Sequence, residues 1–75
     1  MSPTVVTNSI RRLRFEHREM TQQDLAEKVG VTRQTVNAIE AGKYSPSLEV
    51  AFRIAEVFGL RVDEVFQFTR PGRHK

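Results

Sequence analysis

Apolar residues recur along this chain at intervals of three and four, which is the spacing of one buried face of an α-helix. The pattern predicts five helices, over residues 9–18, 22–29, 33–40, 46–58 and 62–65. The positions predicted to face a core are Ile10, Leu13, Leu25, Ala26, Val29, Val36, Ile39, Leu48, Ala51, Ala55 and Phe58. Short helices of this kind are typical of an all-α domain with a single core.

Residues that begin and end helices stand at the borders of these stretches. Three glycines are expected to end helices in the left-handed conformation, namely Gly30, Gly42 and Gly59. Thr21, with Asp24 three residues later, is close to a capping box, and Thr32 is placed to open the next helix. Ser45 is predicted to cap the fourth helix, with Pro46 at its first position, where the absent N–H is harmless.

The two ends of the domain follow a different pattern. Residues 5–7 are β-branched, and residues 66–69 alternate apolar and polar side chains. These segments could pair as a short antiparallel ribbon, which needs helix packing because an isolated two-stranded ribbon is marginal in water. The domain is expected to span residues 8–68, with flexible tails at residues 1–4 and 70–75.

Composition limits the chain to one small domain. Its 75 residues allow a single core, and 39% hydrophobic with 28% charged residues is the balance of a soluble globular protein. The lack of cysteine excludes disulfides, thiolate metal ligands and thiol chemistry. No apolar run approaches the roughly 20 residues of a membrane span, and the first residues lack the pattern of a secretion signal. We therefore expect a cytoplasmic protein without a membrane partner.

The net charge of +3 says little about a polyanionic partner. Arg70, Arg73 and Lys75 account for the whole excess, so the nine other basic residues balance the nine acidic ones. Only the placement of particular side chains can therefore indicate nucleic-acid binding.

Residues 21–40 contain the arrangement that points to a function. Two short predicted helices are joined by residues 29–32, a link so tight that the helices must cross steeply, as in a helix-turn-helix. In that motif the second helix enters the major groove of DNA. The outward positions of this helix carry Arg33, Gln34, Asn37 and Ala38. Arginine can bind guanine, glutamine or asparagine can bind adenine, and a small apolar side chain can contact a thymine methyl group.

Residues 21–43, with the sequence TQQDLAEKVGVTRQTVNAIEAGK, resemble the Cro/repressor-type helix-turn-helix family. The resemblance covers about residues 8–68 and implies a lambda-repressor-like five-helix fold, as in small stand-alone bacterial regulators of the XRE type. It implies that Arg33, Gln34 and Asn37 face the DNA bases. The residues that it implies for contacts to the DNA backbone are Gln22, Thr32, Lys43 and Tyr44.

The same resemblance implies a structural ion pair between the first and third helices, at Arg14 and Glu40. Two features depart from the family pattern. The link between the first and second helices is one residue longer, at residues 17–19. Ala41 stands where many relatives have asparagine, so one possible contact to the DNA backbone is missing.

The fourth predicted helix suggests that the protein forms a homodimer. Four of its residues are apolar in addition to the predicted inward side, namely Val50, Phe52, Ile54 and Val57. Excess apolar surface usually marks an interface. A two-fold dimer would also place two reading helices about 34 Å apart, which matches successive major-groove faces of a palindrome. The predicted interface comprises Val57, Leu60, Val62, Phe66 and Phe68.

Catalytic and metal chemistry are not indicated by the sequence. His17 and His74 are the only histidines, neither has a second ligand at metal spacing, and His17 is expected to be exposed at a helix end. Asp63 and Glu64 are adjacent, so they do not face each other on a helix. Most aromatic residues are expected in the core, with Phe68 left open. We expect no catalytic residue, metal, cofactor or small-molecule ligand.

The sequence therefore predicts a homodimeric, sequence-specific transcriptional regulator that binds double-stranded DNA. A repressor is favoured over an activator, because repression needs only occupancy of an operator. Two alternatives stay open. The first is an antitoxin that represses its own operon, and the second is a protein-interaction module whose DNA contacts are incidental.

Overall fold

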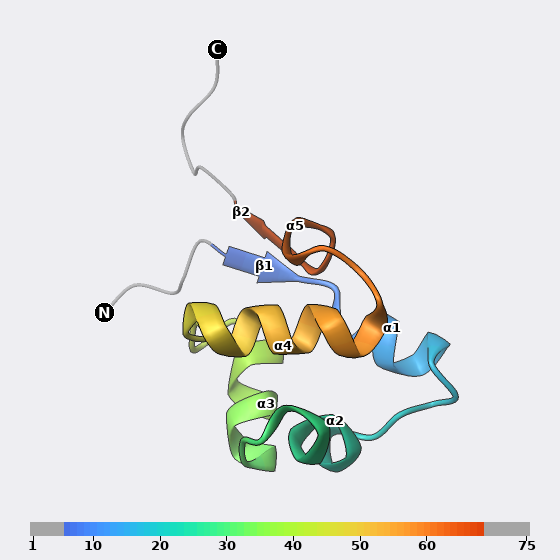
Figure 1. The fold of residues 1–75 in the computed structure, drawn as a ribbon. Helices are drawn as coiled ribbons and strands as arrows, with labels where there is room; N and C mark the ends of the chain where they lie inside the picture. Colours follow the sequence, from blue (N-terminus) through green and yellow to red (C-terminus); the bar gives the residue numbers. More distant parts are fainter. Residues whose placement is uncertain (1–5, 69–75) are drawn as a thin grey trace.

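The computed structural model describes residues 6–68, which form five helices and a two-stranded sheet (Figure 1). The elements in chain order are β1 (Val6–Asn8), α1 (Ile10–Glu16), α2 (Gln22–Val29), α3 (Arg33–Glu40), α4 (Leu48–Phe58), α5 (Val62–Val65) and β2 (Phe66–Phe68). Helices α2, α3 and α5 have the predicted bounds, whereas α1 and α4 are shorter than predicted. The flexible tails expected at residues 1–4 and 70–75 lie outside the described residues.

The core is built from one or more side chains of every helix. Its fully buried large members are Ile10, Leu25, Val29, Val36, Ile39, Ile54 and Val65. Burying one such side chain stabilises the fold by about 1.5–3 kcal/mol. Helix α4 lies between the ribbon and the α2–α3 pair (Figure 1), so its buried side contributes to the centre of the domain.

Helix α1 ends at Glu16, two residues before its predicted limit. Arg18 and Glu19 adopt φ values of +60° and +55°, in the left-handed region that ends helical structure. The Met20 N–H donates to the Arg14 carbonyl at 2.9 Å and closes this turn. The link expected to be one residue longer is therefore a left-handed turn, which neither residue type signals because glycine and asparagine are the usual occupants.

Helix α4 begins two residues later than predicted. Ser47, and not Ser45, is the N-cap, and its hydroxyl accepts a hydrogen bond from the Val50 N–H at 3.2 Å. Pro46 therefore precedes the cap instead of occupying the first helical position. The prediction was wrong because two serines flank the proline, and the sequence alone did not decide between them.

The buried side of α4 also differs from the prediction at two positions. Ile54 is 1% exposed and belongs to the core, whereas Leu48 is 70% exposed. Ala51, Ile54, Ala55 and Phe58 follow the i, i+3, i+4, i+7 spacing of one helix face. Leu48 lies in the first turn, on the same flank as Phe52 one turn later, and Phe52 is 58% exposed. Part of the excess apolar surface of α4 therefore lies on the outside of the monomer.

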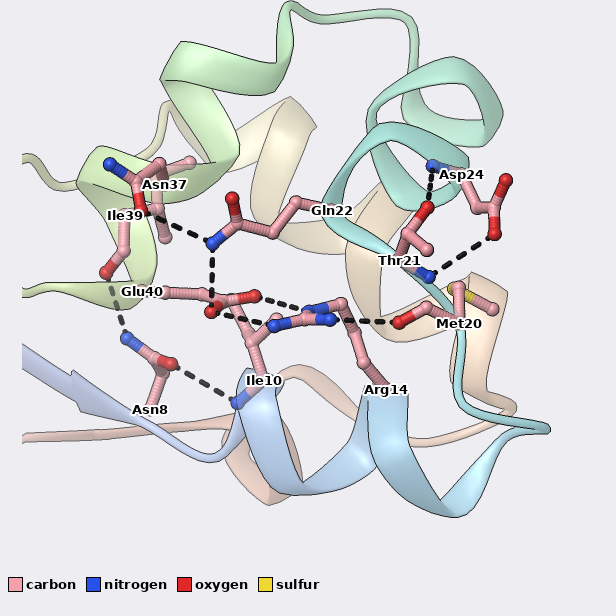
Figure 2. Close-up of polar contacts among 10 residues, drawn as sticks. All are labelled: Asn8, Ile10, Arg14, Met20, Thr21, Gln22, Asp24, Asn37, Ile39 and Glu40. Carbon is pink, nitrogen blue, oxygen red and sulfur yellow. Dashed lines mark hydrogen bonds and ion pairs between the residues drawn. The ribbon is translucent and has the colours of Figure 1, made fainter.

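Strands β1 and β2 pair in antiparallel orientation, as predicted. The register places Val6 opposite Phe68, Thr7 opposite Gln67 and Asn8 opposite Phe66. Asn8 anchors the ribbon to the helices, because its Nδ2 donates to the Ile39 carbonyl at 2.9 Å and its Oδ1 accepts from the Ile10 N–H at 3.1 Å (Figure 2). These bonds supply the helix packing that a two-stranded ribbon needs.

Two predictions about ring side chains are wrong. Only Phe58 and Phe66 of the aromatic residues in the described part of the chain are buried, whereas the exposed ones are Phe15, Tyr44, Phe52 and Phe68. His17, expected to be exposed, is half-buried, and its ring meets that of Phe58 edge-on at a centroid distance of 5.0 Å. His17 follows Leu13 by four residues, and its Nδ1 lies 2.8 Å from the Leu13 carbonyl, so the end of α1 itself places this ring on the buried side of the helix.

Candidate nucleic-acid interface

Helices α2 and α3 form a unit whose ends are fixed by capping hydrogen bonds. The Thr21 hydroxyl accepts from the Asp24 N–H at 3.0 Å, and the Asp24 carboxylate accepts from the Thr21 N–H at 3.1 Å, which completes a capping box (Figure 2). Gly30 ends α2 with a φ of +89°. The Thr32 hydroxyl then accepts from the Thr35 N–H at 3.1 Å and starts α3. Arg53 donates to the Val29 carbonyl at 3.2 Å, so α4 also supports the turn.

Helix α3 has one buried side and one exposed side, as predicted. Val36 and Ile39 are each 1% exposed and pack into the core. The candidate base-reading side chains Arg33, Gln34 and Asn37 are exposed, and Ala38 is half-buried. Helix α3 therefore presents three polar side chains on its exposed side.

Arg14 and Glu40 form the ion pair that the sequence resemblance implied. Arg14 Nε lies 2.5 Å from Glu40 Oε2, and Nη2 lies 3.1 Å from Oε1. Arg14 Nη1 also donates to the Met20 carbonyl at 2.8 Å (Figure 2). The two side chains are only 15% and 9% exposed, so this is a mostly buried pair. It holds the carboxyl end of α3 against α1.

Gln22, the first residue of α2, turns its amide toward α3. Its Nε2 lies 3.2 Å from Asn37 Oδ1 and 3.2 Å from Glu40 Oε1 (Figure 2). The resemblance implied that Gln22 binds a phosphate group. In this structure both hydrogens of the amide are used within the protein.

A groove of about 410 Å³ beside α3 is lined by Arg11, Arg14, Gln22, Asn37, Glu40 and Ala41. Arg11 is exposed and brings a positive charge to the edge of the candidate surface. The arginines of α1 were predicted to form a solvated face, so Arg11 was not among the predicted DNA contacts. The signal was present, because Arg11 is three residues before Arg14 and therefore on the same helix face.

The other candidate backbone contacts lie at the two ends of α3. Thr32 is exposed, and its hydroxyl also contacts the Thr35 hydroxyl at 2.9 Å. At the other end, the Lys43 N–H donates to the Ala38 carbonyl and the Gly42 N–H to the Ile39 carbonyl, both at 3.0 Å. This is a Schellman turn, with Gly42 at a φ of +75°. It leaves Lys43 and Tyr44 exposed just after the helix.

The described residues meet the requirements of neither a metal site nor a membrane-spanning helix. Between residues 6 and 68, His, Asp and Glu side chains do not gather in a group of three or more that could hold a metal ion. None of the helices in this part of the chain has the length and apolar character that crossing a membrane requires.

Comparison with known proteins identifies the family. A family model described as helix-turn-helix matches residues 10–65. An uncharacterised HTH-type transcriptional regulator of Methanocaldococcus jannaschii is 51% identical over 59 residues, which are 79% of this chain and 88% of that protein. The cryptic phage CTXphi transcriptional repressor RstR of Vibrio cholerae is 36% identical over 59 residues, which are 79% of this chain and 52% of the repressor.

A solved structure agrees with these matches. The restriction-modification controller protein C.AhdI of Aeromonas hydrophila superposes with a TM-score of 0.65 and 27% identity, over 73% of this chain and 82% of that protein. The predicted lambda-repressor-like fold and the prediction of a regulator instead of an enzyme are confirmed by these relationships. The chain belongs to the helix-turn-helix family of DNA-binding transcriptional regulators.

Proposed function

We propose that this protein is a repressor that binds a palindromic operator in double-stranded DNA as a homodimer. The observation that carries this proposal is the outer side of α3, where Arg33, Gln34 and Asn37 are all exposed on a helix that is capped and packed on its other side. Polar side chains held on a rigid helix can be matched to base edges at a low entropic cost of ordering. In the proposed complex α3 lies in the major groove, and Ala38 contacts a thymine methyl group.

Contacts to the phosphate backbone would fix the position of α3 in the groove. Thr32 and the exposed pair Lys43 and Tyr44 lie at opposite ends of the helix, where the two walls of a major groove would pass. Arg11 adds a positive charge beside the start of α2. At Gln22, the backbone N–H at the helix start is the group that we expect to face a phosphate.

The proposed dimer interface runs from the end of α4 to β2. A groove of about 570 Å³ in this region is lined by Phe52, Ala55, Glu56, Gly59, Leu60, Arg61 and Val62. Val57, Leu60 and Val62 are half-buried, and Phe68 is 64% exposed. Phe66, which the sequence also placed in the interface, is 9% exposed and belongs to the monomer core, so it offers little surface to a partner. A second copy would cover the apolar side chains that remain exposed.

Repression is the regulatory outcome that we favour. A small domain can repress by occupying an operator that overlaps a promoter, and the relative RstR is described as a transcriptional repressor. Bacterial and archaeal DNA lies in the cytoplasm, so we expect a protein that binds operators in such DNA to be cytoplasmic.

Selection of bound fragments from a random duplex library at physiological salt tests the proposal. We expect one consensus with two inverted half-sites whose centres are about one helical turn, or a multiple of it, apart. A half-site consensus without two-fold symmetry would contradict the homodimer. Recovery of fragments with no common sequence would contradict sequence-specific regulation itself.

A further inference from the structure

The side-chain amide of Gln22 donates two hydrogen bonds within the protein. Its Nε2 lies 3.2 Å from Glu40 Oε1 and 3.2 Å from Asn37 Oδ1. An amide nitrogen carries two hydrogens, so both donors are used. Phosphate oxygens accept but do not donate in this setting, and the remaining Gln22 oxygen is itself an acceptor. The side chain therefore has no free group with which to bind a phosphate in this arrangement.

The ion pair between Arg14 and Glu40 determines how the amides of Gln22 and Asn37 are oriented. The Glu40 carboxylate is paired with Arg14 through both oxygens and offers only acceptors. Gln22 must therefore turn its nitrogen, and not its oxygen, toward Glu40. Because the same nitrogen also faces Asn37, Asn37 must turn its oxygen inward. Figure 2 shows the result, with Asn37 Oδ1 toward Gln22 and Nδ2 pointing away from it.

We propose that Gln22 is a positioning residue, which fixes the Asn37 amide so that Asn37 donates from Nδ2 and reads a purine at its N7 atom. Purines present N7 as an acceptor in the major groove, whereas cytosine presents an amino group that donates. An Asn37 held as a donor accepts a purine N7, as it would a thymine O4, and rejects cytosine. This inference rests on the proposed function, in which α3 lies in the major groove.

The restraint matters because an exposed asparagine amide is otherwise free to turn over. The terminal torsion of asparagine is broad and roughly two-fold, so an unrestrained amide can present either its nitrogen or its oxygen. Such a side chain would bind a purine N7 through nitrogen and a cytosine amino group through oxygen.

A double-mutant cycle on base discrimination tests the role of Gln22. The position read by Asn37 is identified as the base pair at which Asn37→Ala alone changes the preference of the protein. Affinities are then measured for duplexes with a purine or a cytosine at that position. We expect Gln22→Ala to lower the purine-to-cytosine affinity ratio at least about fivefold, and to lower it no further when Asn37 is already alanine.

The matched control is Gln23→Ala, because Gln23 lies in the same turn of α2 and bonds to Glu27 at 2.9 Å instead. We expect this variant to keep the wild-type ratio. The positioning role is overturned if Gln22→Ala weakens binding to all duplexes equally and does so in the Asn37→Ala background as well. A wild-type protein that prefers no duplex at all would contradict the proposed function instead.

A second variant changes the outward group of residue 37 from a hydrogen-bond donor to an acceptor and leaves Gln22 in place. Asn37→Asp keeps an inward oxygen for the Gln22 amide and replaces the outward donor with an acceptor. We expect its preference at this base pair to move from purine toward cytosine. A variant that binds specifically at the other positions but keeps the wild-type purine preference here would overturn the inferred orientation of Asn37.

Discussion

Glu40, the last residue of α3, is bound through both carboxylate oxygens by Arg14 of α1, at 2.5 and 3.1 Å. Arg14 also binds the Met20 carbonyl just before α2 at 2.8 Å. One side chain therefore joins α3 to α1 and to the segment that leads into α2 (Figure 2). This fixes the helix that we propose to read DNA relative to the rest of the domain, and it orients the Gln22 amide next to it.

Loss of this ion pair should strongly destabilise the fold. We expect Arg14→Ala to lower the free energy of unfolding by about 3 kcal/mol, because it leaves Glu40 mostly buried and without its charged partner. The control is Arg12→Ala on the same helix, which removes an exposed pair with Glu16 at 3.2 Å and should cost less than about 0.5 kcal/mol. Urea unfolding measures both, and equal costs would contradict the structural role of Arg14.

The capping box of α2 should make stability depend on acid pH. Hydrogen bonds from the backbone N–H and the side chain of Thr21 hold the pKa of Asp24 below its ordinary value. Because the folded-state pKa is the lower one, the stabilising contribution is complete above the ordinary aspartate pKa of about 3.9. It is lost as the pH falls through the folded-state pKa.

The variant Asp24→Asn isolates this effect. We expect it to be less stable than the wild type at neutral pH and to lose less stability on acidification below about pH 4. Thermal unfolding followed by circular dichroism between neutral and acid pH gives both curves. Curves that stay parallel down to the lowest pH would show that Asp24 does not contribute in this way.

The two sides of α4 should respond differently to truncation. Ile54→Ala removes a side chain that is 1% exposed and should cost about 2–5 kcal/mol through lost burial and a cavity. Leu48→Ala changes a side chain that is 70% exposed and should alter stability by less than about 0.5 kcal/mol. Denaturant titration of the two variants distinguishes the observed packing from the sequence prediction, in which Leu48 faced the core.

Aromatic surface near the ribbon should matter for self-association. We expect Phe68→Ser to weaken homodimerisation about tenfold or more, because exposed aromatic residues dominate many interfaces. Phe15→Ser is the control, since Phe15 is 68% exposed but lies on α1, outside the proposed interface. Sedimentation equilibrium measures the dissociation constants. A wild-type protein that stays monomeric at tens of micromolar, or equal weakening by both variants, would contradict this interface.

Much of the fold follows from local rules that the sequence displays. Thr21, Thr32 and Gly30 bound α2 and α3 by capping chemistry that depends on neighbouring residues alone, so those bounds were predicted. The turn at Arg18 and Glu19 was not predictable in detail, because arginine and glutamate rarely adopt a positive φ and neither residue type signals such a turn. His17, by contrast, lies four residues after Leu13 on the buried side of α1, so helical spacing alone could have indicated its partial burial.

The candidate site was predictable to a similar extent. The exposed face with Arg33, Gln34 and Asn37 follows from helical periodicity, and the Arg14–Glu40 pair follows from the family resemblance. The bonds of Gln22 to Asn37 and Glu40 could not be foreseen, because they depend on how closely the start of α2 approaches the side of α3. The distance between α2 and α3 depends on how the two helices pack together, so the sequence of one helix alone does not reveal it.

The most direct test of the account is a binding comparison with an operator series in which every base pair is changed in turn. We expect Gln34→Ala to lose about 1–3 kcal/mol of discrimination at one base pair of each half-site. Lys43→Ala should instead weaken binding to all members alike and reduce the salt slope by about one unit. If Gln34→Ala leaves every preference of the wild-type protein intact, or weakens all sequences equally, α3 does not read the bases and the account is wrong.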